Sequence, residues 1–95
     1  MLRIKAWLTH KGIRQTPIHS GYRPAVFFFP NHPTSGVIRL LDREELLPGE
    51  RAIVEITPVS ESLVGNLTIG QIIKIGESPR HIVGEIEIIE ILRDE

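Results

Sequence analysis

The sequence predicts an all-β fold in which six short strands close into one barrel. Apolar and polar residues alternate with a period of two along several segments, as they do in half-buried strands. Turn residues, chiefly glycine, proline and asparagine, separate these segments. A closed barrel of such strands also leaves no sheet edge exposed. With 95 residues, 41% of them hydrophobic, the chain has enough apolar material for one core, so we expect a single domain over residues 1–95.

The first predicted strand covers residues 2–9, where every even position is apolar, and a turn at 10–12 ends it. The second covers the aromatic run at 23–29, which holds all three phenylalanines and is bounded by prolines. We expect the middle of this strand to be shielded on both faces. A third strand is predicted through 37–40, after a loop over 31–36.

Residues 42–45 predict a single helical turn, because an aspartate followed three residues later by a glutamate can cap free backbone N–H groups. Pro48 and Gly49 would stop that turn. The fourth predicted strand covers 51–57, residues 59–66 are expected to form a loop, and the fifth strand covers 67–75.

The segment 76–79 is predicted to turn into a sixth strand over residues 81–92. The glutamates of this strand change parity along its length, so we expect a β-bulge near Ile88 or Ile89 to restore the register. A helix over 84–93 is the competing interpretation. Five isoleucines and a glycine within residues 81–92 favour the strand.

Charge is distributed unevenly along the chain. Up to Leu41 there are six basic residues and no acid, whereas from Asp42 onward there are five basic residues and twelve acids. If the early strands and loops share one side of the fold, that side would attract phosphates or an acidic protein. Alternatively, a barrel brings early and late strands together and mixes the two signs over its surface.

The sequence lacks the residues that are characteristic of several classes of enzyme and ligand-binding protein. The chain has no cysteine and no phosphate-binding loop, so no thiolate catalysis and no nucleotide binding are expected. The four histidines do not have metal-ligand spacing, and Glu85 and Glu87 are typical of solvated acids on one strand face. No serine nucleophile motif is present. We therefore expect a protein that is not an enzyme, with no cofactor and no metal.

The first residues alternate charged with apolar side chains, which is not typical of a signal peptide. No stretch of about 18 apolar residues predicts a membrane span. The expected location is the cytoplasm, with no membrane partner.

The segment from residue 11 to 23 is the strongest candidate for a binding surface. Its basic, amide, hydroxyl and aromatic side chains can contact phosphate and ribose groups of RNA. The alternative is a polar surface loop that Tyr22 and Arg23 anchor to the barrel. The candidate residues in this segment are Lys11, Arg14, Gln15, Thr16, Tyr22 and Arg23.

This segment also carries a resemblance to a known family. The motifs Gly12-Ile13-Arg14-Gln15-Thr16-Pro17 and Gly21-Tyr22-Arg23-Pro24, followed by Val26-Phe27-Phe28-Phe29, are similar to the start of the third domain of elongation factor Tu. Further resemblances follow in order, in Thr34-Ser35-Gly36-Val37-Ile38, Leu47-Pro48-Gly49-Glu50, Ile56-Thr57-Pro58 and Ile82-Val83-Gly84. The likeness covers about residues 2–92.

The resemblance implies a six-stranded antiparallel barrel that does not hydrolyse GTP. In the family this domain helps hold the T arm of aminoacyl-tRNA, packs against the GTPase domain and contacts the nucleotide-exchange factor. Arg14 and Thr16 match the tRNA-contacting pattern, and Ser35 stands in for a threonine. Three further polar positions of the family are occupied by Gln15, Ala25 and Thr57.

Two functions follow as expectations. The chain is a non-catalytic module that contacts tRNA or other RNA, or it is a protein-interaction or regulatory module that resembles elongation factor Tu and binds one of its protein partners. The sequence leaves open which partner is correct, and it does not give the oligomeric state.

Overall fold

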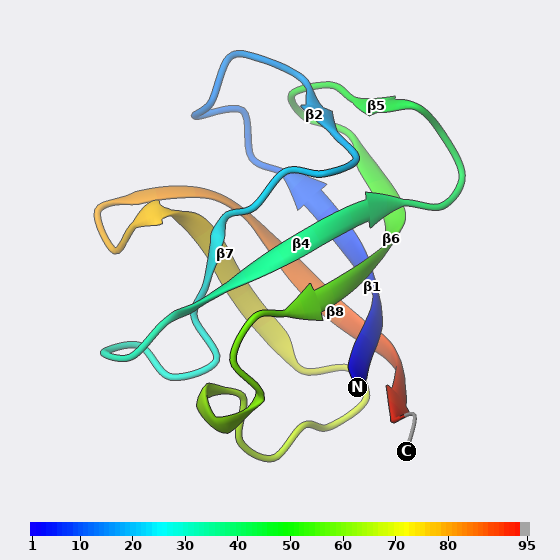
Figure 1. Ribbon diagram of the computed structural model, residues 1–95. Helices are drawn as coiled ribbons and strands as arrows, with labels where there is room; N and C mark the ends of the chain where they lie inside the picture. Colours follow the sequence, from blue (N-terminus) through cyan, green and yellow to red (C-terminus); the bar gives the residue numbers. More distant parts are fainter. Residues whose placement is uncertain (94–95) are drawn as a thin grey trace.

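Six strands form a closed antiparallel barrel, as the sequence predicts (Figure 1). The computed structural model describes residues 1–93; Asp94 and Glu95, two of the twelve acids counted above, lie outside the described residues. Around the barrel the strands follow the order β1 (Leu2–His10), β6 (Arg51–Pro58), β4 (Thr34–Leu40), β3 (Ala25–Val26), β7 (Ile72–Ser78) and β8 (His81–Arg93). The last strand, β8, pairs with β1 and closes the sheet.

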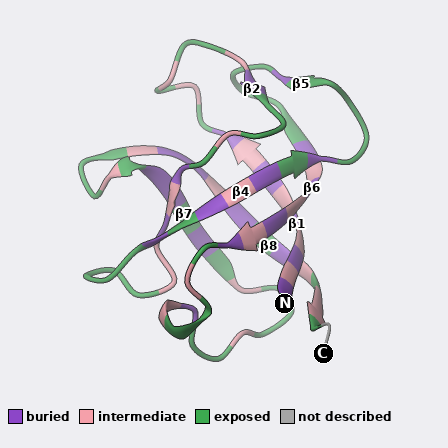
Figure 2. Cartoon of the chain, in the orientation of Figure 1, coloured by how far each residue is buried: buried purple, intermediate pink, exposed green. Residues whose placement is uncertain are grey.

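The alternating pattern of the sequence places one face of each long strand in the core. Every even residue of β1 is buried and every odd one is partly exposed between Leu2 and His10, and β4 and β6 alternate in the same way (Figure 2). Fully burying one aliphatic side chain contributes roughly 1.5–3 kcal/mol, so this inner face supplies most of the driving force for folding. The core cluster includes Leu2, Ile4, Leu8, Val26, Ile38, Val54, Ile56, Ile75, Ile86 and Ile88.

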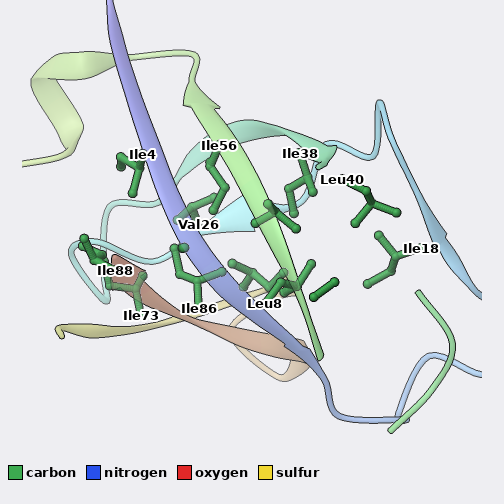
Figure 3. Close-up of a cluster of buried hydrophobic side chains, with 14 of the residues drawn as sticks. Ile4, Leu8, Ile18, Val26, Ile38, Leu40, Ile56, Ile73, Ile86 and Ile88 are labelled. Atoms are coloured by element: carbon green, nitrogen blue, oxygen red, sulfur yellow. The ribbon is translucent and has the colours of Figure 1, made fainter. Parts of the chain in front are cut away.

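A second sheet of two short strands covers one end of the barrel (Figure 1). It pairs β2 (Ile18–His19) with β5 (Glu45–Leu46). The helical turn predicted at 42–45 is therefore wrong. The extended backbone of β5 puts successive side chains on opposite faces, so Leu46 is completely buried while Glu45 faces solvent. Ile18 of the partner strand lies in the same cluster of buried side chains (Figure 3).

The aromatic run forms a much shorter strand than predicted. Only Ala25 and Val26 belong to β3, and the chain bends after Phe27. Phe29 is 43% exposed and its ring lies against Gly65, where an added Cβ would come within 2.6 Å of the ring. The ring thus packs on the loop after β6 rather than on the sheet, whereas Val26 in the middle of the run is buried and Phe28 packs against the core.

That loop also contains the helical segment η1 (Glu61–Leu63). No helix within residues 1–93 is long and apolar enough to cross a membrane.

The fifth predicted strand is displaced along the chain. It begins at Ile72 rather than 67 and continues through Gly76 to Ser78, so the predicted turn at 76–79 is reduced to residues 79–80. Gly70 has a positive φ of 88°, which interrupts extended structure before the strand. Gly76 is a strand residue that pairs with Ala25 and Ile82, and only glycine fits there because the His81 carbonyl occupies the space where a Cβ would lie.

The last strand contains the predicted bulge. Lys5 of β1 pairs with Glu90 and Ala6 pairs with Ile88, so Ile89 is the extra residue. The bulge keeps Ile88 in the core and Glu90 exposed. The alternative helix over 84–93 is wrong, because this segment pairs with strands on both sides.

The barrel interleaves the two halves of the chain and thereby mixes their charges. Arg3 and Arg39, from the basic first half, both lie beside Glu55 of β6, with N–O distances of 3.6 and 3.4 Å. Lys11 lies 3.1 Å from Glu85 of β8. The early cations are therefore not gathered on one strongly basic side.

The bulge provides a test of the register. Deleting Ile89 should leave a barrel with continuous alternation, because Ile88 and Glu90 already pair with successive residues of β1. We expect a loss of about 1 kcal/mol or less in the free energy of unfolding. Deleting Ile53 from β6, which has no bulge, should reverse every later side chain of that strand and abolish cooperative unfolding. Urea denaturation followed by circular dichroism measures both, and equal damage from the two deletions would contradict the assignment of Ile89.

Candidate functional site

Four of the seven predicted binding residues meet on one outer surface of the barrel, around Glu77. A depression of about 130 Å³ is lined by Ile13, Arg14, Glu77 and His81. A second, of about 240 Å³, is lined by Tyr22, Arg23, Ala25, Ser35 and Glu77. Because Glu77 borders both, we call this region the Glu77 surface. It consists of Ile13, Arg14, Tyr22, Arg23, Ala25, Ser35, Glu77 and His81.

The other three predicted residues are not part of this surface. Lys11 is paired with Glu85 on the next strand. The Gln15 side chain donates its amide N–H to the Gly12 carbonyl oxygen at 2.8 Å, which folds the loop on itself. Thr16 contacts the His10 ring through its backbone carbonyl oxygen. The predicted group therefore divides into residues that line the surface and residues that shape the loop beside it.

The loop is fixed by His10, a residue that sequence reasoning treated only as part of a turn. His10 is completely buried. Its Nδ1 accepts a hydrogen bond from the Gly12 N–H at 3.1 Å, and its Nε2 is 3.0 Å from the Thr16 carbonyl oxygen. Because Nδ1 accepts, the ring proton is on Nε2 and donates to Thr16. Extending the even-position pattern of β1 by one residue would have identified His10 as inward-facing.

Arg14, Tyr22 and Glu77 form the centre of the Glu77 surface. The Arg14 guanidinium lies over the Tyr22 ring, 4.6 Å from its centroid, and its Nη1 donates to Glu77 Oε1 at 3.3 Å. The Tyr22 hydroxyl is buried and has no hydrogen-bond partner among residues 1–93. This site therefore presents an arginine that is stacked on an aromatic ring and paired with a carboxylate, next to a hydroxyl that lacks a partner among the described residues.

The surroundings raise the pKa of Tyr22 above its ordinary value of 10.0. Burial of the hydroxyl is the largest cause, since it disfavours the phenolate, and the negative charge of Glu77 adds to it. Arg14, in contrast, lowers the pKa of Tyr22. Because its guanidinium lies over the ring, we ascribe this effect mainly to its charge.

Arg23 and Ser35 occupy the other depression. Ser35 of β4 pairs directly with Ala25 of β3, so the two side chains lie side by side. Arg23 is exposed and forms no ion pair with any other described residue. It is therefore the cation of this surface that is available to a partner. Thr57, one of the altered family positions, pairs with Val37 and does not line either depression.

Chemically, this surface offers hydrogen-bond donors, one carboxylate and an aromatic ring. Within residues 1–93, His, Asp and Glu side chains form no group of three that could hold a metal ion. Glu77 was assigned to a turn by its sequence context, and no local signal placed it beside Arg14, from which it is separated by 63 positions.

The fold and this surface define a small antiparallel barrel with a mixed-charge patch on its outer wall. Comparison of the sequence with models of known protein families and with curated proteins gives no match.

Tyr22 is the only tyrosine of the chain, so its titration can be followed without a signal from another tyrosine. Replacing Glu77 with glutamine should lower the Tyr22 pKa, because it removes the second cause of the raised value. The pKa of Tyr22 is higher in the folded chain than in the unfolded chain. The contribution of this difference to the free energy of unfolding is therefore present below about pH 10 and is lost as the pH rises through the folded-state pKa. Alkaline titration of tyrosinate absorbance measures the shift. Glu45→Gln, at the β2–β5 sheet, is the control, and an unchanged Tyr22 pKa in E77Q would refute the assignment.

The role of His10 predicts a selective loss of stability. His10→Ala removes both ring contacts and leaves the Gly12 N–H and the Thr16 carbonyl without partners, so we expect a loss of about 3 kcal/mol. His32→Ala, at an exposed loop position, should change the free energy of unfolding by less than about 0.5 kcal/mol. Chemical denaturation of both variants provides the comparison. Equal stability of the two variants would show that His10 does not hold the loop.

Proposed function

We propose that this chain is a non-catalytic binding module that docks another protein on the Glu77 surface. The observation that carries the proposal is the cluster of Arg14, Tyr22 and Glu77: Arg14 pairs with Glu77 and lies over the ring of Tyr22, whose buried hydroxyl has no hydrogen-bond partner among residues 1–93. The resemblance to the third domain of elongation factor Tu supports a binding role, because that domain acts by contact and not by catalysis.

The charges of the surface favour a protein over a nucleic acid. Arg14 already faces Glu77, and Lys11 already faces Glu85. A phosphate group that approached either cation would also approach a carboxylate, and like charges a few ångströms apart oppose each other. A protein partner can present an acid to the cation and a base to the carboxylate at the same time.

The surface also has the composition of a protein interface. Arginine and tyrosine are enriched among the residues that contribute most to protein binding. Ile13, which borders the surface, is 59% exposed and offers apolar contact area. The existing ion pair costs little to rearrange, because an exposed pair contributes only about 0–1 kcal/mol. A barrel of this size offers a limited contact area, so we expect modest affinity.

Contact with RNA backbone is the second candidate function. It is favoured by Arg23, whose exposed guanidinium has no ion-pair partner among the described residues and lines the same depression as the Ser35 side chain. With one such cation, the affinity for RNA would fall with salt as expected for about one or two phosphate contacts.

Site-specific photo-crosslinking in cells that express the chain distinguishes these functions. The photo-reactive residue p-benzoylphenylalanine is placed at Ile13 or, as a matched control, at Ile69, which is equally exposed, lies in the loop before β7 and lines neither depression. We expect a defined protein adduct from position 13 that is absent from position 69. Glu77→Arg should reduce that adduct about tenfold, because it reverses the charge that the partner meets.

Each alternative outcome has a clear meaning. An adduct that ribonuclease removes and that Arg23→Ala abolishes would replace the protein partner with RNA. Identical adducts from positions 13 and 69, or an adduct that E77R leaves unchanged, would refute docking at the Glu77 surface.

A further inference from the structure

We propose that β7, along the edge that is free at Ile72, binds an extended, apolar and acidic peptide segment of a partner protein as an additional strand. This site is distinct from the Glu77 surface, because its groove shares no lining residue with either depression there. The inference goes beyond the proposed function and does not depend on it.

The edge is free because β3 is too short to cover β7. Pairing between them is limited to Ala25 with Gly76 and Val26 with Ile75, and it ends with the Phe27 N–H donating to the Lys74 carbonyl at 3.0 Å. Backbone groups of alternate strand residues point the same way, so those of Ile72 point toward the same side as the Lys74 carbonyl. The chain bends away after Phe27, and no described segment pairs with Ile72 on that side.

A mostly apolar groove lies next to this edge. It has a volume of about 350 Å³ and is lined mainly by Phe27, Pro30, Ile72, Pro79 and Ile82. Ile72 is 60% exposed, and Phe29 and Ile69 nearby in sequence are also exposed. A strand edge provides backbone hydrogen bonds, and an adjoining pocket selects a side chain of the bound segment; together these are the two elements of recognition by strand addition.

Charge indicates which segment fits. Lys74 is the charged residue that lines the groove, and it forms no ion pair with another described residue. Its neighbour across the ladder, Glu85, is engaged by Lys11 at 3.1 Å. A bound strand with an acidic residue beside Lys74 would complete this pairing, because opposite charges on adjacent strands attract.

The same charge argues against a second copy of this chain as the occupant. If the β7 edges of two copies paired about a two-fold axis, the paired segment would be only a few residues long. The Lys74 side chains of the two copies would then lie close together. Like charges placed opposite each other destabilise a strand pair. The favoured occupant is therefore a different chain with carboxylates.

The test uses the full chain and a fluorescein-labelled peptide with glutamate and valine two residues apart, so that both side chains lie on the face that meets Ile72 and Lys74. A lysine–valine peptide of the same length is the charge control, and a glutamate–valine peptide with N-methylated backbone amides is the hydrogen-bond control. Fluorescence anisotropy should detect the first peptide and neither control. In ¹H–¹⁵N spectra, the amide resonances of Ile72 and Lys74 should shift on titration.

Two variants separate this site from the other surface. Lys74→Glu should weaken binding of the glutamate peptide about tenfold and favour the lysine peptide instead. Arg23→Glu, a charge reversal at an exposed cation of the Glu77 surface, should leave peptide binding unchanged.

Several results would overturn the inference. These are no binding of the glutamate peptide to the folded chain, equal binding of both charged peptides, unchanged Ile72 and Lys74 amide resonances, or light scattering that shows a dimer with these amides protected. None of these results would alter the crosslink expected at Ile13, so failure here is distinguishable from failure of the proposed function.

Discussion

The pairing of β8 with β1 closes the sheet, and the core and both candidate surfaces depend on that closure. It requires a very close approach at one end, where the Thr9 carbonyl occupies the space that a side chain at position 84 would need, and only glycine fits there. At the other end the extra residue Ile89 lets the strand bend without turning its apolar side chains outward. With both features in place, the inward face of every long strand is removed from water.

Closure also determines the electrostatics of the outer wall. Strands from the basic first half lie next to strands from the acidic second half, so charges that are far apart in sequence become neighbours. Lys11 meets Glu85 and Arg14 meets Glu77 as a result. A surface of alternating sign is suited to a partner with its own mixture of charges, whereas a uniformly basic patch would suit a polyanion.

The features that could be predicted from sequence are those fixed by local pattern. Period-two alternation predicts β1, β6 and β8, and the change of parity among the glutamates of β8 predicts its bulge. The unpredicted features depend on distant partners. Leu46 is extended because it pairs with β2, the Phe29 ring lies against Gly65 of a distant loop, and Gly76 continues a strand because it pairs with β3 and β8.

The candidate site divides in the same way. The residue types of the 11–23 segment indicated a binding surface, and the structure brings Arg14, Tyr22, Arg23 and Ser35 together. No local pattern could reveal Glu77, because the β7–β8 turn approaches this loop only after closure. At the free edge of β7, Lys74 and the prolines have one more consequence. Every copy of the chain carries the same positive charge and rigid residues there, so edge-to-edge stacking of identical molecules into fibres is disfavoured even though the edge is uncovered.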